Sequence, residues 1–217
     1  MVASPSIKFN VAWFKLAEFV SRKEKERAFA IYRLLVHSLE DQALSVQLEA
    51  DLLLAFNDEK ALCVYERAAQ LYESSGRIIQ ALLLYERIIT MSSPTIDRLT
   101  KMLTLYQQGT DEGKLARCAA VLVRLFLENN QREQADGLLQ TLVLSPYNNA
   151  LLHEAYTLYL LQTTALLNEF DVICEHIHIT MNGFLSNHAD KRMTLFLSKL
   201  AAINDRAHAY ACTCITQ

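Results

Sequence analysis

Residues 61–94 read ALCVYERAAQLYESSGRIIQALLLYERIITMSSP, and their pattern predicts two helices joined by a short turn. A small residue and an aromatic residue recur at a step of four, first as Ala61 and Tyr65 and again as Ala81 and Tyr85. Residues four apart lie on one side of a helix, where the small residue lets a second helix approach and the ring fills the adjacent space. The stretch therefore predicts a packed helical hairpin.

The same spacing of three and four between apolar residues recurs along nearly the whole chain, which predicts an all-α protein. Gly76, Ser92-Ser93-Pro94 and Asn129-Asn130 are typical helix ends. Only residues 176–180 alternate with the period of a strand. Helices are predicted over residues 10–22, 24–38, 42–56, 58–75, 77–92, 95–108, 112–128, 131–144, 148–163, 165–182, 187–203 and 205–215. Because the connections are short, neighbouring helices are expected to pack antiparallel.

The composition excludes several classes of protein. Of 217 residues only 5 are glycine and 3 are proline, which leaves few turn-forming residues for β-hairpins. Hydrophobic residues make up 52% and charged residues 21%, as in globular rather than disordered chains. The formal charge of −3 gives no overall field that would recruit nucleic acid or an anionic membrane, so neither is expected as a partner.

The sequence also predicts a cytoplasmic, reducing environment. The N-terminal residues MVASPSIKFN lack the charged start and apolar run of a secretory signal, and no stretch approaches the roughly 18 apolar residues of a membrane span. The 5 cysteines are an odd number without the regular spacing of a disulfide framework. We therefore expect free thiols and no membrane partner.

One segment carries a family resemblance. From Leu62 to Pro94 the chain resembles one full tetratricopeptide repeat in the order and spacing of Tyr65, Ala68, Ala69, Tyr72, Gly76, Ala81, Tyr85, Ile88 and Pro94. Weaker copies use Trp13, Leu16, Ala17, Phe19, Ala28, Tyr32 and Leu35, and then Ala119, Val123, Phe126, Ala135, Leu139, Leu142 and Pro146. The resemblance implies antiparallel helical hairpins stacked as a right-handed α-solenoid.

The resemblance also implies an organisation and a core. Residues 1–147 are predicted to hold the repeats, and residues 148–217 to hold divergent repeats or a helical cap in the same continuous domain. The aromatic residues at repeat spacing, which are Trp13, Tyr65, Tyr72 and Tyr85, are predicted to be core residues rather than partner contacts.

Solenoids of this family resemble one another in presenting a concave surface to a polypeptide partner. In the best repeat the positions that would face such a groove are Cys63, Glu66, Gln70 and Glu73. Family members that grip a C-terminal carboxylate have Lys and Asn at such places, so the acidic pair here favours a basic or helical partner. The alternative is that these residues form the solvated side of an amphipathic helix.

Cysteine and histidine residues near the C-terminus suggest a second hypothesis, a structural zinc site made by Cys174, His178, His208 and Cys212. His208 and Cys212 would share one side of a helix. Cys174 and His176 would point about 200° apart on a helix, and no half-site has a recognised zinc spacing. Ordinary buried cysteines and surface histidines are the alternative, and no cofactor is predicted.

Catalytic motifs are absent from the sequence: there is no phosphate-binding glycine loop, and His153-Glu154 lacks a second histidine four residues on. Cys118 or Cys174 would act as a nucleophile only with a neighbouring base and a lowered pKa. The sequence therefore predicts a non-catalytic interaction module, acting as a scaffold, an assembly subunit or a chaperone-like adaptor. A helical zinc protein and an enzyme of unrecognised type remain the alternatives.

The last predicted helix is unusually apolar for the end of a solenoid, which needs a polar outer face. Its apolar residues are Ala207, Ala209, Tyr210, Ala211, Cys212, Cys214 and Ile215. We expect this end to be covered by a second copy of the chain, by a partner or by further polypeptide.

Overall fold

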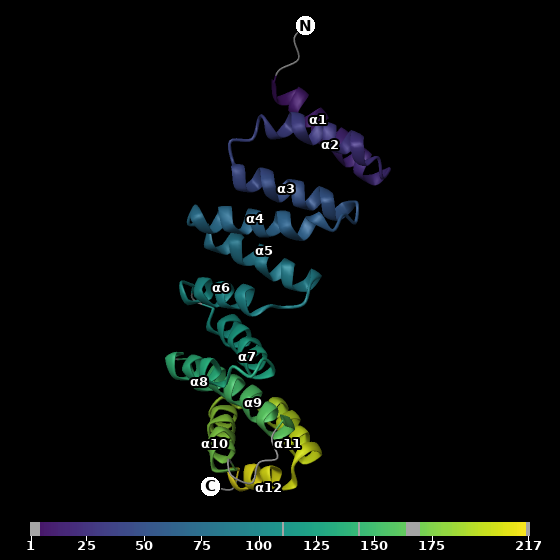
Figure 1. Cartoon of the computed structure of the whole chain (residues 1–217). Helices are drawn as coiled ribbons and strands as arrows, with labels where there is room; N and C mark the ends of the chain where they lie inside the picture. The colour runs from purple at the N-terminus through teal and green to yellow at the C-terminus, as the bar shows by residue number, and fades with distance from the viewer. Residues whose placement is uncertain (1–4, 110, 143, 164–169, 216–217) are drawn as a thin grey trace. The chain divides into compact units, whose positions relative to one another are not determined.

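The computed structural model describes residues 5–109, 111–142, 144–163 and 170–215, and every regular element within these ranges is an α-helix. The chain divides into two compact units, Met1–Ser93 and Pro94–Gln217 (Figure 1). The predicted change of character at residue 147 therefore lies inside the second unit. The all-α prediction is confirmed, whereas stacking into a right-handed solenoid stays a prediction.

The helices take up almost all of both units. The first unit contains α1 (Pro5–Ser21), α2 (Lys25–Val36), α3 (Gln42–Ala55), α4 (Lys60–Ser74) and α5 (Ile78–Met91). The second unit contains α6 (Ile96–Gln107), α7 (Glu112–Glu128), α8 (Arg132–Thr141), α9 (Pro146–Thr163), α10 (Phe170–Ser186), α11 (Asp190–Ile203) and α12 (Asp205–Thr213). None of the described helices combines the length and the apolar character needed to cross a bilayer.

Two helices extend beyond their predicted ends. Helix α1 begins at Pro5 rather than near residue 10, and proline suits the first turn because its missing N–H needs no helical partner there. Helix α10 runs through Gly183 to Ser186 instead of ending at residue 182. The alternating residues 176–180 lie inside α10, and its predicted start at residue 165 lies outside the described residues.

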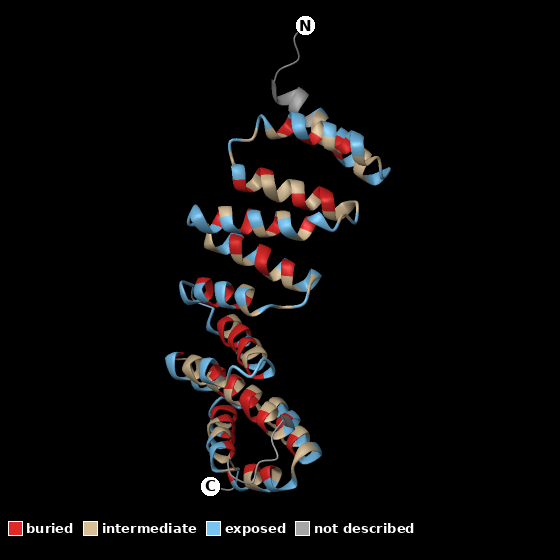
Figure 2. Cartoon of the chain, in the orientation of Figure 1, coloured by how far each residue is buried: buried red, intermediate tan, exposed pale blue. Residues whose placement is uncertain are grey.

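In the first unit, α4 packs between α3 and α5. The small residues of the repeat pattern, Ala68 and Ala81, are fully buried, and the rings of Tyr65, Tyr72 and Tyr85 are buried as well. Buried positions recur along α3, α4 and α5 (Figure 2). These tyrosines are core residues, as the spacing predicts. The indole of Trp13 is half-buried and packs against a cluster formed by residues of α1, α2 and α3.

Polar groups tie the neighbours of α4 together at the edge of this core. The Tyr65 hydroxyl donates to the Asp51 carboxylate of α3, which also pairs with Arg87 Nη1 of α5 at 3.1 Å. The Arg87 guanidinium lies 4.9 Å from the centre of the Tyr65 ring. The Tyr72 hydroxyl donates to Gln47 Oε1 at 2.7 Å. Helices α3 and α5 are thus linked through side chains that meet at α4.

Several turns between helices need a left-handed backbone. Gly76, between α4 and α5, has a φ of 73°, which is in the left-handed region. Glycine adopts this conformation without steric strain because it has no Cβ. The same region is occupied by Lys23, Asn57, Asn130 and His188, each directly or shortly after a helix. Asparagine takes this conformation more readily than lysine or histidine does. A chain poor in glycine therefore closes most of these turns with other residues.

In the second unit, α9 packs against α7 and most extensively against α10. The α9–α10 approach is close: a Cβ built on Gly183 would lie 2.4 Å from the Pro146 oxygen and 2.6 Å from Ala150 Cβ. Only glycine leaves room for the two helices to meet here. This is the physical reason that α10 keeps a glycine in its interior. The packing fixes α9, which carries the site described below.

Neighbouring helices of the same unit bury much of the apolar side of the last helix. Ala207, Ala211 and Cys214 are buried, and α12 packs against α10 and α11 of the same unit. Ile215 remains 42% exposed. Much of the apolar surface that motivated an external cover is thus buried within the chain, and the homo-oligomer stays a prediction.

Candidate functional site

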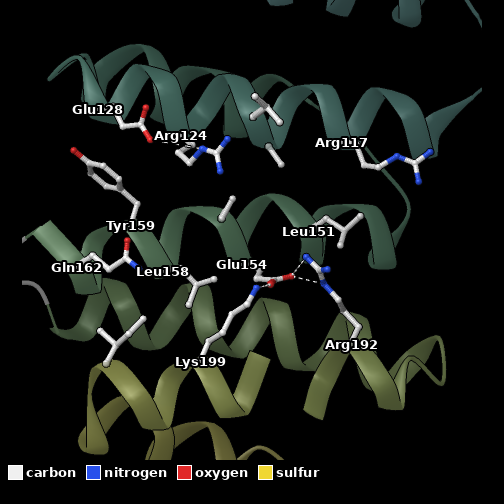
Figure 3. Close-up of a pocket in the computed structure, with 14 residues that line it drawn as sticks. Arg117, Arg124, Glu128, Leu151, Glu154, Leu158, Tyr159, Gln162, Arg192 and Lys199 are labelled. Atoms are coloured by element: carbon white, nitrogen blue, oxygen red, sulfur yellow. Dashed lines mark hydrogen bonds and ion pairs between the residues drawn. The ribbon is translucent and has the colours of Figure 1, made fainter. Parts of the chain in front are cut away.

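Among the described residues, the second unit has a groove between α7, α9 and α11, which we call the α9 groove (Figure 3). Its volume is about 620 Å³, within the range of ligand-binding sites. It is lined by Arg117, Ala120, Val121, Arg124, Glu128, Leu151, Glu154, Ala155, Leu158, Tyr159, Gln162, Arg192, Lys199 and Ile203.

Helix α7 forms one wall. Arg117, Val121, Arg124 and Glu128 follow one another at steps of four, three and four, so they lie on one side of the helix. Arg124 Nε lies 3.6 Å from Glu128 Oε1, and both side chains are about half exposed. No ion pair within the described part of the chain involves Arg117, which is exposed. This wall therefore presents one unpaired cation and one loosely paired cation.

Helix α9 forms the floor, and its lining residues again fall on one helical side. Leu151, Ala155 and Leu158 give the floor an apolar strip that is partly exposed. Near the end of this strip the Tyr159 hydroxyl donates to the Leu127 carbonyl oxygen at 2.5 Å, which ties α9 to α7. The floor can therefore contact apolar groups of a ligand.

Glu154 is the polar centre of the floor. Its side chain is only 2% exposed, and it receives Arg192 Nη2 at 2.7 Å and Lys199 Nζ at 3.2 Å from α11. Both cationic side chains are about 40% exposed, so each of them contacts the buried carboxylate and also the solvent. A buried carboxylate needs such partners because its desolvation is costly. The three residues hold α11 against α9.

The charges of the α9 groove do not cancel. The lining contains four cationic and two anionic side chains, so its formal charge is +2. The cations are Arg117, Arg124, Arg192 and Lys199, and the anions are Glu128 and Glu154. The chain as a whole carries −3. The groove thus combines a local excess of positive charge with an apolar floor, an arrangement suited to binding an amphipathic anionic ligand.

The acidic surface predicted on α4 lies in the first unit. Cys63, Gln70 and Glu73 are exposed and Glu66 is half-buried. Tyr85 of α5 directs its hydroxyl toward Glu73 Oε2 at 3.4 Å, and the carboxylates of Glu73 and Glu66 contribute to raising the pKa of Tyr85, after burial, to about 12. The four residues share one helical side, as predicted, and nothing in the structure tests whether a partner binds them.

The structure brings together only two of the proposed zinc ligands. Cys212 Sγ lies 3.6 Å from His208 Nε2, whereas His178 Nε2 contacts the Asn182 amide at 2.9 Å. The described residues contain no group of three or more His, Cys, Asp or Glu side chains placed to hold one metal ion. All five cysteines are free.

The two proposed nucleophiles have pKa values shifted against that role. Burial raises the pKa of Cys118 to about 12, and burial also raises the pKa of Cys174. A nucleophilic thiol needs the opposite shift, because the thiolate is the reactive form. The direction of these two shifts therefore does not favour the cysteine-nucleophile hypothesis.

Sequence reasoning missed a pair of histidines between α9 and α10. His153 Nδ1 lies 2.5 Å from His176 Nδ1, and the centre of the His176 ring lies 4.6 Å from the centre of the tilted Tyr156 ring. Burial lowers the pKa of His153 to about 4, with a further contribution from His176 and an opposing one from Glu175. Burial also lowers the pKa of His176. The pair is held neutral near pH 7.

Glu154 was also missed, although the sequence contains a signal for it. It is the only charged residue between Pro146 and Thr163, in a run that is otherwise mostly apolar. A charge in such a run has to find a partner. The partners lie 38 and 45 residues away, and no local pattern identifies them.

Comparison of the chain with protein-family models, with characterised proteins and with solved structures finds no match.

Proposed function

We propose that the protein is a non-catalytic interaction module that binds a polypeptide segment in the α9 groove, as a scaffold or adaptor within an assembly. The observation that carries this proposal is the groove itself: three helices present facing sides around a partly exposed apolar floor of Leu151, Ala155 and Leu158. Apolar residues on a shallow helical surface are how helix-lined grooves hold amphipathic peptides.

The resemblance of residues 62–94 to a tetratricopeptide repeat supports the same class of function, because solenoids built from such hairpins use exposed helix sides to contact polypeptides. The α4 face of Cys63, Glu66, Gln70 and Glu73 is a second proposed surface, suited by its charge to a basic partner. Reversing Glu66 and Glu73 to Lys is expected to weaken such binding while helicity is retained, and unchanged affinity would remove this surface from the proposal.

The groove is tested by selecting a display library of random peptides, about 16 residues long to allow about four helical turns, against the full chain. We expect peptides that bind the unmodified chain and lose affinity when Ala155→Trp fills the floor. Ala201→Trp is the matched control, since Ala201 is exposed on α11 outside the groove lining. Circular dichroism verifies that both variants fold.

Two results would contradict the proposal. Recovery of no specific peptide would remove the interaction module as the function, and peptides insensitive to Ala155→Trp would place binding elsewhere on the chain.

A further inference from the structure

Resting on the proposed function, we infer that the partner of the α9 groove is an acidic amphipathic helix, whose carboxylates pair with Arg117 and Arg124 while its apolar side covers the α9 floor. The inference concerns the charge, the spacing and the conformation of the partner. Three observations carry it.

The first observation is the distribution of charge. The groove lining has an excess of two positive charges in a chain whose net charge is −3, so the lining attracts an acidic segment. Arg117 has no ion pair among the described residues, and Arg124 has only a distant and exposed one. When these two arginines pair with a partner, the only ion pair among the described residues that the protein would lose is the weak one between Arg124 and Glu128.

The second observation is spacing. Arg117 and Arg124 are seven residues apart on α7, which is about 10.5 Å along the axis, and Arg192 and Lys199 have the same separation on α11. Carboxylates seven residues apart on a partner helix match this separation when the helix lies along the groove. The floor from Leu151 to Gln162 extends for about 16 Å, close to three helical turns.

The third observation distinguishes a peptide from a nucleic acid. The floor of the lining is formed by Leu151, Ala155 and Leu158, and the hydroxyl of its one tyrosine, Tyr159, donates to a backbone carbonyl oxygen of α7. Single-stranded nucleic acid is usually held by unopposed cations and by aromatic rings free to stack on bases. The apolar floor of leucine and alanine fits aliphatic side chains instead.

The test uses the peptides selected on the full chain and measures their affinity by fluorescence polarisation. We expect enrichment in Asp and Glu at a seven-residue spacing, and affinity that falls as NaCl is raised from about 0.05 M to about 0.5 M. Arg117→Glu with Arg124→Glu should weaken binding about tenfold or more. Circular dichroism of the bound peptide should show a gain in helicity.

The matched control is the double reversal Lys101→Glu with Lys191→Glu. Both lysines are exposed in the same unit and lie outside the groove lining, so the net charge changes equally. The lysine reversal is expected to weaken binding less than the arginine reversal does, because neither lysine lines the groove and exposed charges are screened.

Four results would overturn the inference. They are selected peptides without acidic enrichment, no effect of the arginine reversal, an equal effect of the lysine reversal, and displacement of the peptide by oligothymidine at lower concentration than by a second acidic peptide. In the first two results a peptide still occupies the groove when Ala155→Trp abolishes binding, so the proposed function survives. Only the absence of any groove-dependent peptide contradicts both.

Discussion

The close approach of α9 and α10 at Gly183 predicts that a larger residue at this position destabilises the second unit. In Gly183→Ala the added Cβ would lie 2.4 Å from the Pro146 oxygen, 3.2 Å from the Pro146 carbonyl carbon and 2.6 Å from Ala150 Cβ. These are backbone atoms and a Cβ, which have no side-chain rotation available to move them away. The helices would have to separate by about 1 Å to restore ordinary contact distances of about 3.5 Å.

The cost of this separation is near the upper end of the overpacking range, about 3 kcal/mol, because the most extensive helix interface of the unit is opened. Alanine recovers about 1 kcal/mol of helix propensity relative to glycine. We therefore expect Gly183→Ala to lower the free energy of unfolding by about 2 kcal/mol, measured by urea denaturation with far-ultraviolet circular dichroism.

The same substitution in α8 is the control. Gly137 lies inside that helix, and a Cβ built there would have no heavy atom within 4 Å outside its own local backbone. Gly137→Ala should raise the free energy of unfolding by about 0.5–1 kcal/mol. If Gly183→Ala were neutral or stabilising, the α9–α10 packing described above would be wrong, and with it the position of α9 as the floor of the groove.

Three further predictions concern single side chains. Tyr85→Ala should lower the free energy of unfolding by about 3–5 kcal/mol because the ring is buried, whereas Tyr85→Phe should cost less than about 1 kcal/mol because its hydroxyl is 3.4 Å from Glu73; near-equal values in denaturant titrations would contradict this. Glu154→Gln should lower the free energy of unfolding by about 2 kcal/mol. This is less than the roughly 3–5 kcal/mol typical of a fully buried pair, because Arg192 and Lys199 can turn toward water. An unchanged free energy of unfolding would show that the ion pairs add no stability. The pKa of His153 is lowered from 6.5 to about 4, so the folded state binds fewer protons than the unfolded state, and the stability present above pH 6.5 should decline by at most about 3 kcal/mol as pH falls toward 4. Denaturation at a series of pH values measures this decline, which His153→Gln should reduce; an identical pH profile for the variant would exclude the histidine pair as its cause.

Local spacing predicted the helices and much of the core because both depend on residues three and four apart. Ala81 and Tyr85 identified the buried side of α5, and Gly76 identified its turn from α4. The same signals did not predict the left-handed turns at Lys23 and His188, since neither residue type marks such a turn as glycine does. The need for glycine at position 183 was not predictable from local spacing. It depends on Pro146 and Ala150 of α9, which lie far from α10 residues in the sequence.

The candidate site was less predictable because it depends on contacts between distant helices. The clearest repeat pattern, in residues 62–94, predicted a groove at Glu66 and Glu73 of α4. The α9 groove lies instead in a stretch with little repeat signal, and its polar centre joins Glu154 to cations 38 and 45 residues further along the chain. The position of Glu154 in a mostly apolar run is the one signal in the sequence for such a contact, and tertiary packing determines which cations pair with it.

Glu154 connects the stability of the second unit with the binding proposed for its groove. The carboxylate now engages Arg192 and Lys199, which a partner carboxylate would also attract. Glu154→Gln removes that competition and raises the formal charge of the lining from +2 to +3. The variant should therefore bind selected acidic peptides about threefold or more tightly while its unfolding free energy falls, opposite signs for two properties of one side chain. Fluorescence polarisation below the unfolding transition measures the first effect, and weaker binding by folded Glu154→Gln would show that the cations act through Glu154 to shape the groove rather than to attract the partner.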